Sequence, residues 1–287
     1  MARTVDEGFS DLLSRLTPST TESSAAASHR ASVEACLKTN HGLTRLFRSG
    51  SFGFGTSVSG YSDVDYFAVF PGDRLHQSST DSLTQIASSL RTRFPNTGVM
   101  VDAPAIVVPF GSTRSEKHEI IPAHYIGQTA AKHDSFGIPD RVGGWMRASP
   151  DAMAAWVNAA DKKLSGKVKP LIRLMKAWKY YCDVPIRSYF LELRTVEWAL
   201  TQSTIIYRYD VKSTLAHLSN NLGTIAEPET GDTVYVCFTT ELAAVKSKIA
   251  NAYDWAAYAL SEEAAGRVTN AFNAWDHVFG SNFPAYY

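Results

Sequence analysis

Two aspartates separated by one residue stand at the start of an apolar segment. Asp63 and Asp65 lead into the run at residues 66–70. Alternate side chains of a strand point to the same face, so both carboxylates would face one side. Two such carboxylates repel each other unless a cation lies between them, and oxygen ligands favour Mg²⁺. The spacing therefore predicts a magnesium site that uses Asp63 and Asp65.

A glycine-serine step lies upstream of the aspartates. Gly50 would let the backbone approach a ligand closely, and Ser51 would add a hydroxyl and backbone N–H groups. Such a turn can hold phosphate groups. The segment GSFGFGTSVSGYSDVDYF, residues 50–67, would thus supply both a triphosphate cradle and metal ligands.

A third carboxylate would complete a site for two metal ions, which activates the attacking oxygen and stabilises the leaving pyrophosphate. Glu119 is the best candidate because it lies in an apolar strand-like segment, where an unpaired carboxylate is costly. Asp102 is the rival, but it precedes an Ala-Pro step and is expected to end a strand.

Composition limits the class of protein. The 287 residues carry a formal net charge of zero, without the basic excess typical of proteins that grip long DNA. Three dispersed cysteines form no zinc-binding or disulfide pattern, which favours free thiols in a reducing compartment. Neither a signal peptide nor a membrane span is expected, so the prediction is a cytoplasmic protein.

The pattern of apolar residues predicts two parts. Helices are expected at residues 5–16, 19–39, 81–94, 151–164, 167–182, 188–202, 211–221, 240–259 and 262–278. Strands are expected from residue 46, at 63–70, 98–101, 105–110 and 118–123, with a polar turn at 111–116. The interpretation is a catalytic core with N-terminal helices, residues 1–148, packed with a helical lobe, residues 149–287.

These motifs resemble the signature of the polymerase-β-like nucleotidyltransferase superfamily. The segments HEIIPA, GGWMRASP, RLMKAWK, IRSYFLE and FGSNFPAY are similar to those of cGAS/DncV-like nucleotidyltransferases (CD-NTases), in particular the compact bacterial cyclic-dinucleotide synthases. The resemblance spans about residues 40–287. It implies an α+β fold in which a mixed sheet with flanking helices joins an oligoadenylate-synthase-like helical lobe, with the active site in the cleft between them.

The resemblance also implies roles for individual residues. Gly50 and Ser51 would bind the donor phosphates. Two Mg²⁺ ions, or Mn²⁺ in their place, would be held by the catalytic acids Asp63, Asp65 and Glu119. Glu119 would also help to activate the acceptor hydroxyl, although many relatives have Asp at this position. Lys176 and Ser188 would contact the triphosphate from the helical lobe.

Patterns in the helical lobe leave alternatives open. Lys169, Arg173, Lys176 and Tyr180 recur at helical spacing, which fits either a phosphate-facing stripe or a solvated charged face. Ser188 could cap a helix as well as contact phosphate. Asn158 could contact a base edge or be a solvated amide. Tyr66 and Tyr180 are candidates for stacking on a base.

The leading hypothesis is a template-independent nucleotidyltransferase that makes a cyclic di- or oligonucleotide from nucleoside triphosphates (ATP, UTP or GTP). The resemblance implies a monomer whose product activates a separate effector in bacterial anti-phage (CBASS) signalling. An alternative is transfer of one nucleotide to an antibiotic, an RNA end or a protein hydroxyl. A non-catalytic nucleotide sensor ranks last, because such a protein is expected to have lost acids that are retained here.

Overall fold

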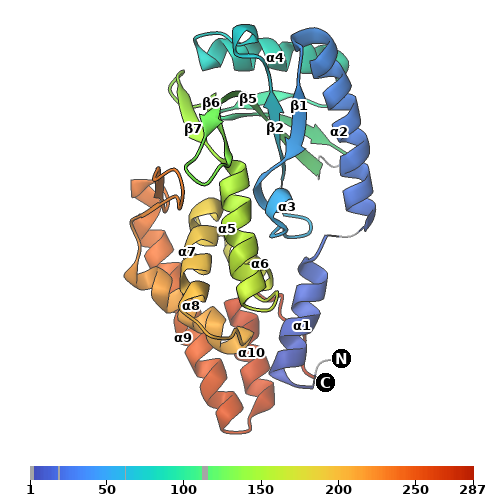
Figure 1. Ribbon diagram of the computed structural model, residues 1–287. Helices are drawn as coiled ribbons and strands as arrows, with labels where there is room; N and C mark the ends of the chain where they lie inside the picture. Colours follow the sequence, from blue (N-terminus) through green and yellow to red (C-terminus); the bar gives the residue numbers. More distant parts are fainter. Residues whose placement is uncertain (1–2, 19, 62, 112–115) are drawn as a thin grey trace. The chain divides into compact units, whose positions relative to one another are not determined.

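The computed structural model describes residues 3–18, 20–61, 63–111 and 116–287 of the chain, which divides into two compact units (Figure 1). The sheet unit comprises residues 18–155 and 228–230. The helical unit comprises residues 1–17, 156–227 and 231–287. Ser62, inside the Gly-Ser/Asp motif, and most of the expected turn at 111–116 lie outside the described residues.

The sheet unit is built on a mixed sheet. Its strands are β1 (Arg45–Arg48), β2 (Val64–Val69), β3 (Met100–Asp102), β4 (Ala105–Phe110), β5 (Glu116–Gln128), β6 (Asp134–Pro139) and β7 (Trp145–Ala148). The order is β1-β2-β5-β4-β3, and β6 pairs with the second half of β5 and with β7. The pairing of β2 with β5 is parallel and the other pairings are antiparallel. Its helices are α2 (Thr20–His41), α3 (Gly50–Phe54), η1 (Gly72–Arg74) and α4 (Ser79–Arg93), and the chain leaves this unit within α5 (Pro150–Lys163).

Strand β2 separates two apolar clusters. Tyr66 and Ala68 belong to the larger cluster, which also contains buried side chains of α2 and α4. Phe67 and Val69 point the other way and pack with β5 and β6. This alternation follows from the two-residue period of a strand. It means that odd-numbered positions of β2, Asp65 among them, share one face.

The sequence predicted only some of the strands of this sheet. The strand expected at 118–123 continues to Gln128, and β6 and β7 follow it as an antiparallel extension. Gly137 and Pro139 interrupt the apolar pattern of β6, and β7 is only four residues long and includes Arg147. Pairing of β6 with β5, and of β7 with β6, nevertheless supplies backbone hydrogen bonds to these strands, which local propensity does not record.

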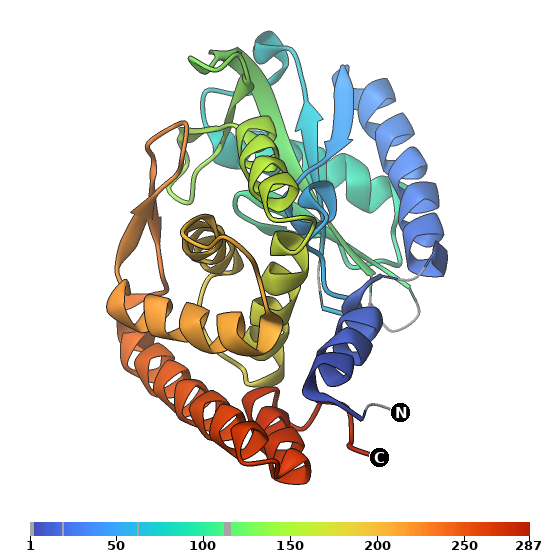
Figure 2. The same ribbon diagram turned by 60° about the horizontal axis from the view of Figure 1, so that its bottom comes forward.

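The helical unit consists mainly of α1 (Val5–Leu16), α6 (Val168–Tyr181), α7 (Ser188–Leu200), α8 (Tyr207–Asn220), α9 (Leu242–Ala264) and α10 (Val268–Val278). A hairpin of β8 (Thr224–Ala226) and β9 (Thr233–Tyr235) and the turn η2 (Thr239–Glu241) complete it. Figure 2 shows α9 and α10 as a long antiparallel hairpin, with α8 packed on α9. A mixed sheet with flanking helices plus a helical C-terminal part is the expected α+β fold.

The first helix belongs to the helical unit, whereas the sequence interpretation grouped it with the catalytic core at residues 1–148. Helix α1 contacts α6, α8 and α10. Phe9 lies edge-on to Trp275, Phe279 and Phe283, with ring centroids 4.9 to 6.0 Å apart. Burial of this aromatic side chain therefore ties residues 1–17 to the C-terminal helices. The two units meet in sequence inside α5 rather than at residue 148.

The structure allows a comparison with two expectations from composition, free thiols and the lack of a membrane span. Cys36, Cys182 and Cys237 are free thiols, and burial raises the pKa of each. None of the helices in the described segments combines the length and apolar character needed to cross a membrane.

The end of α9 provides a test of stability. Arg267 and Asn270 donate hydrogen bonds to the Glu262 carboxylate and lower its pKa to about 2. A carboxylate with a lowered folded-state pKa stabilises the protein above its unfolded-state value near 4.5, and this contribution is lost as the pH falls toward 2. We expect Glu262→Gln to lower the free energy of unfolding in urea at pH 7, and the deficit to shrink between pH 4.5 and the lowest pH at which the fold persists.

Asp254→Asn is the control for that experiment, because it removes an exposed carboxylate from the same helix. Its deficit at pH 7 should be smaller. A Glu262→Gln deficit that does not change with pH would contradict the assignment to the ionised carboxylate.

Candidate active site

Asp65 and Glu119 lie side by side on neighbouring strands. Their Cα atoms are direct partners in the parallel pairing of β2 with β5. Both side chains project from the face that carries Phe67 and Ile121. A hydrogen bond links the two carboxyl side chains, which requires a proton between them when no cation is bound. The structure thus brings together two acids that are 54 positions apart in the sequence.

Electrostatics mark Glu119 as unusual. Burial is the largest cause that raises the pKa of Glu119, and the charge of Asp63 is the second. The hydrogen bond from Asp65 opposes this rise, and the charge of Asp102 adds to it. Asp63 itself is half-buried and directly precedes β2. Asp63 and Asp65 therefore both act on Glu119, and the rival acid Asp102 acts on it from an exposed position at the end of β3.

The turn that precedes β2 lies directly against Asp65. Gly50 has φ +53°, and a Cβ placed on it would overlap Oδ2 of Asp65. The N–H of Ser49 donates to the carbonyl oxygen of Asp65 at 2.9 Å, and Gly53 N–H donates to Ser49 O at 3.0 Å. Only glycine satisfies both the left-handed backbone and the close approach. Gly50 and Ser51 therefore begin a short helical turn, α3, at the edge of the acidic pair.

A metal ion would meet a suitable set of donors here. In the described parts of the chain, no three His, Cys, Asp or Glu side chains are already grouped tightly enough to hold one. The fit rests on the chemistry of the donors, which are carboxylate oxygens, and on the hydrogen bond that already joins Asp65 to Glu119. Gly50 has no side chain that would crowd the Asp65 carboxylate. Hard oxygen donors of this kind suit Mg²⁺ or Mn²⁺.

Lys176 and Ser188 were predicted to contact phosphate from the helical unit, and the structure gives the two side chains different surroundings. Lys176 is only 1% exposed, and its ammonium pairs with Oε1 of Glu192, which is 2% exposed. Lys179, one turn further along α6, donates from Nζ to Ser188 Oγ at 2.9 Å. The hydroxyl of Tyr180 lies 3.5 Å from the same Oγ. Ser188 thus has Lys179 beside it, while the Lys176 ammonium lies inside the unit against a carboxylate.

Lys179 and Glu192 were missed as site residues although the quoted motifs contain both. The predicted stripe followed i, i+4 and i+7 spacing from Lys169, and Lys179 falls outside it. A charged residue at the fifth position of SYFLE, in an otherwise apolar segment, was the available signal for a buried partner.

The remaining candidates have simple placements. Asn158 is exposed on α5, and Ser188 begins α7 without using its side chain as a cap. The backbone N–H of Lys169 donates to Asp161 Oδ1 at 3.0 Å, and burial lowers the pKa of half-buried Arg173. The suggestion that Tyr66 stacks on a base is wrong, because its side chain is fully buried in the sheet unit.

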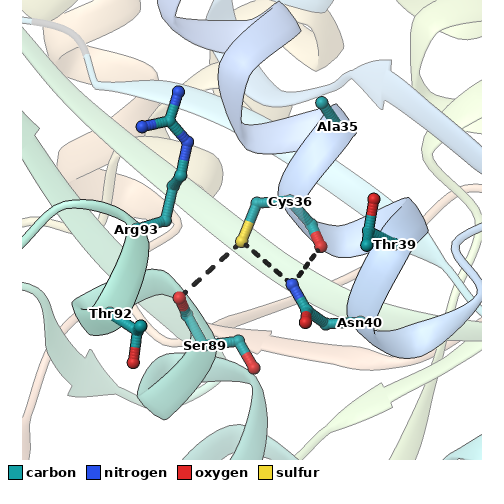
Figure 3. A pocket seen from close by; sticks show the side chains of 7 residues that line it. All are labelled: Ala35, Cys36, Thr39, Asn40, Ser89, Thr92 and Arg93. Carbon is teal, nitrogen blue, oxygen red and sulfur yellow. Dashed lines mark hydrogen bonds between the residues drawn. The ribbon is translucent and has the colours of Figure 1, made fainter.

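A pocket of about 470 Å³ lies elsewhere in the sheet unit, between α2 and α4 (Figure 3). Its lining residues are Ala35, Cys36, Thr39, Asn40, Ser89, Thr92 and Arg93. The Cys36 thiol and Asn40 amide are partnered within it: Sγ donates to Ser89 O at 3.7 Å, and Nδ2 donates to Cys36 O at 2.8 Å. None of the predicted site residues lines this pocket.

Known proteins share this arrangement of elements. The solved structure of Escherichia coli MS115-1 CdnC with ATP matches with a TM-score of 0.75 and 18% identity, covering 97% of this chain and 98% of that one. Apo Vibrio cholerae DncV matches with a TM-score of 0.76 and 13% identity, covering 98% and 96%. At this level of identity, the likeness establishes the polymerase-β-like nucleotidyltransferase fold.

Two curated relatives match over part of their length. A probable cyclic nucleotide synthase of Bacillus cereus (strain VD146) is 24% identical over 182 residues, which are 61% of this chain and 54% of the relative. A cyclic AMP-AMP-AMP synthase of Acinetobacter sp. (strain ATCC 27244 / 9458) is 24% identical over 192 residues, 61% of this chain and 52% of the relative. The match thus spans about half the length of each relative.

The family model for the Second Messenger Oligonucleotide or Dinucleotide Synthetase domain matches residues 3–161. This segment includes the Gly-Ser turn, all three acids and the pairing of β2 with β5. The matched segment is more than half of the chain and carries the acidic site, so the protein belongs to the Second Messenger Oligonucleotide or Dinucleotide Synthetase family.

Proposed function

We propose that this protein joins nucleoside triphosphates into a cyclic di- or oligonucleotide without a template and releases pyrophosphate. The observation that carries the proposal is the contact between Asp65 and Glu119 beside Gly50, in a chain of the synthetase family. One relative is described as a cyclic AMP-AMP-AMP synthase, and a solved structure as a cyclic AMP-GMP synthase with a linear intermediate. These descriptions support a cyclic product made in successive steps.

The acids would bind a divalent cation, as members of this family do. Asp63, Asp65 and Glu119 supply oxygen donors, and cation binding would displace the proton shared by Asp65 and Glu119. When bound, Mg²⁺ supplies charge neutralisation for the triphosphate and lowers the pKa of the acceptor hydroxyl. The backbone at Gly50 and the Ser51 hydroxyl would hold the donor phosphates. Glu119 would orient the acceptor hydroxyl and receive its proton.

We further propose that Lys179 and Ser188 bind the triphosphate tail. Their contact at 2.9 Å puts an ammonium and a hydroxyl at the start of α7, where backbone N–H groups are available for an anion. This proposal keeps Ser188 in the role expected from the sequence and gives the lysine role to Lys179. Asn158 is retained as a candidate base contact because its amide is exposed. We propose that the product activates a separate effector protein in anti-phage defence.

The product assay tests the central proposal. Purified protein is incubated with ATP, GTP, CTP and UTP and with Mg²⁺ or Mn²⁺, and the products are treated with phosphatase and identified by mass spectrometry. We expect a phosphatase-resistant cyclic product without an added acceptor. Asp63→Ala with Asp65→Ala should lower pyrophosphate release by at least roughly 100-fold, because the cation loses its ligands.

Asp102→Asn is the matched control for the acids, because Asp102 is exposed yet acts electrostatically on Glu119. It should retain activity within a few-fold. Nucleotide consumption only after addition of an RNA, antibiotic or protein acceptor would identify a single-nucleotide transferase instead. No turnover of any nucleotide with either metal would contradict both enzyme functions.

Gly50→Ala tests the close approach of the turn to Asp65. The new methyl group would overlap the Asp65 carboxylate, so we expect activity to fall at least roughly 10-fold. Gly42→Ala is the control: Gly42 also has a positive φ, of +70°, but nothing lies within 4 Å of its added Cβ. Both variants should lose about 1–2 kcal/mol of stability from backbone strain. Equal activity of the two variants would contradict the role of Gly50.

Lys179→Ala tests the triphosphate contact. Loss of a charge-assisted hydrogen bond should raise KM for the nucleotide roughly 10-fold, with a smaller change in kcat. The difference from the unmodified protein should shrink at high salt. Lys246→Ala removes an exposed lysine of α9 and should leave KM unchanged. An unaltered KM in Lys179→Ala would exclude this lysine from the nucleotide site.

A further inference from the structure

Two polar pairs join α6 to α7 at successive turns. Lys176 pairs with Glu192, and Lys179 donates to Ser188 Oγ at 2.9 Å. The residue number rises along α6 as it falls along α7, so the helices run in opposite directions. With a rise of about 1.5 Å per residue, three positions on α6 and four on α7 correspond to about one turn. The two pairs are therefore neighbouring links between the same two helices.

The two links differ in burial. Lys176 and Glu192 are buried, at 1% and 2% exposure, and the residues that flank them along both helices are buried and apolar. Lys179 and Ser188 are half-buried, so a ligand can reach them more easily. One link lies inside the helical unit, and the other lies nearer to its surface.

Stability alone does not account for the buried link. Removing two charges from water costs about as much as their attraction returns, and well-packed apolar residues are often as stabilising or better. An ion pair differs from an apolar contact in being directional, because a charge-assisted hydrogen bond sets both distance and orientation. Apolar contacts tolerate sliding of one helix along another more readily.

Other contacts hold the far side of α7. The Tyr189 hydroxyl donates to Glu227 Oε1 at 2.5 Å, and Arg194 Nη2 donates to the carbonyl oxygen of Thr224 at 2.7 Å. These bonds connect α7 to the β8–β9 hairpin. Neither of these bonds involves α6. Among the contacts between α6 and α7, the Lys176–Glu192 pair is a buried charged link.

We propose that Lys176 and Glu192 form a positioning pair that sets the register of α6 against α7 and thereby holds Lys179 and Ser188 together for one phosphate group. The inference rests on the proposed triphosphate role of Lys179 and Ser188. Lys176 acts through this register and does not touch the nucleotide. A slip of one residue, about 1.5 Å along the helix axes, would lengthen and misalign the 2.9 Å hydrogen bond between Nζ and Oγ.

Replacement of the pair by apolar residues separates positioning from stability. Lys176→Met with Glu192→Leu should keep a melting temperature within about 5 °C of the unmodified protein or above it. KM for the nucleotide should nevertheless rise roughly 5- to 10-fold, as in Lys179→Ala. The shorter-acid, longer-base pair Lys176→Arg with Glu192→Asp retains a directional link and should recover most of the lost affinity. A stable apolar variant with unaltered KM would overturn the proposal.

Glu192→Gln provides a second measurement that does not depend on the apolar variant folding. It keeps the Lys176 ammonium and nearly the same shape. If Lys176 contacted phosphate directly, releasing it from Glu192 would leave KM unchanged or lower it, and the proposal would fail. If the pair sets the register, KM should rise. Calorimetry with a non-hydrolysable triphosphate should likewise show weaker binding to Glu192→Gln than to the unmodified protein.

Arg267→Met with Glu262→Leu is the matched control, because it removes another ion pair of the helical unit, at the junction of α9 and α10. It should change stability without changing KM. Failure of the proposed function would appear separately, as an unmodified protein that consumes no nucleotide or a Lys179→Ala variant with unaltered KM. A different result would reject the positioning role and leave the triphosphate role of Lys179 intact. In that case KM would be raised in Lys179→Ala but normal in Lys176→Met with Glu192→Leu and in Glu192→Gln.

Discussion

The contact between the carboxyl groups of Asp65 and Glu119 is the constraint on which the site depends. The parallel register of β2 and β5 places these residues directly opposite each other. The next same-face pair, Phe67 and Ile121, is apolar and packs in the core. Along β2 and β5, the paired acids are thus only two residues away from an apolar pair in the core. Burial and the charge of Asp63 raise the pKa of Glu119, and the hydrogen bond from Asp65 opposes this rise. Such an arrangement of buried acids contributes little to stability and fits the proposed cation site.

The backbone around the acids is built for the same purpose. The carbonyl of Asp65 accepts the Ser49 N–H, while the side chain of Asp65 fills the space that a Cβ at Gly50 would need. One residue therefore anchors the turn through its main chain and contributes to the site through its carboxylate. The apolar clusters on both faces of β2 hold this strand on either side. The packed strand and the fitted turn together hold these groups in place, as the proposed phosphoryl transfer would require.

The helical unit places its polar groups according to a similar principle. Lys176 and Glu192 lie among apolar neighbours, where a charged group is stable only when it is paired. Lys179 and Ser188 lie one turn away and are half-buried. In the sheet unit two carboxyl groups are brought together and share a proton. In the helical unit two opposite charges satisfy each other, and the neighbouring Lys179 donates to Ser188.

The local sequence was sufficient for the features that depend on short spacing. It identified the Gly50–Ser51 turn and most of the long helices within a few residues. These follow from glycine's freedom at positive φ and helical periodicity. The same-face relation of Asp63 and Asp65 stays a prediction, because β2 begins at Val64. Glu119 was identified because a lone acid in an apolar strand needs a partner, although its partner was not visible in the local pattern.

Tertiary packing was needed for every feature that depends on what a side chain meets. Lys176 and Lys179 are both lysines on one helix, and only the approach of α7 gives the first a buried carboxylate and the second a serine hydroxyl. Strand β6 forms because β5 extends to pair with it, and β7 pairs in turn with β6. Helix α1 joins the helical unit because Phe9 packs against the aromatic residues of the C-terminal segment. Burial and pairing are long-range properties, so composition and periodicity over a few turns do not encode them.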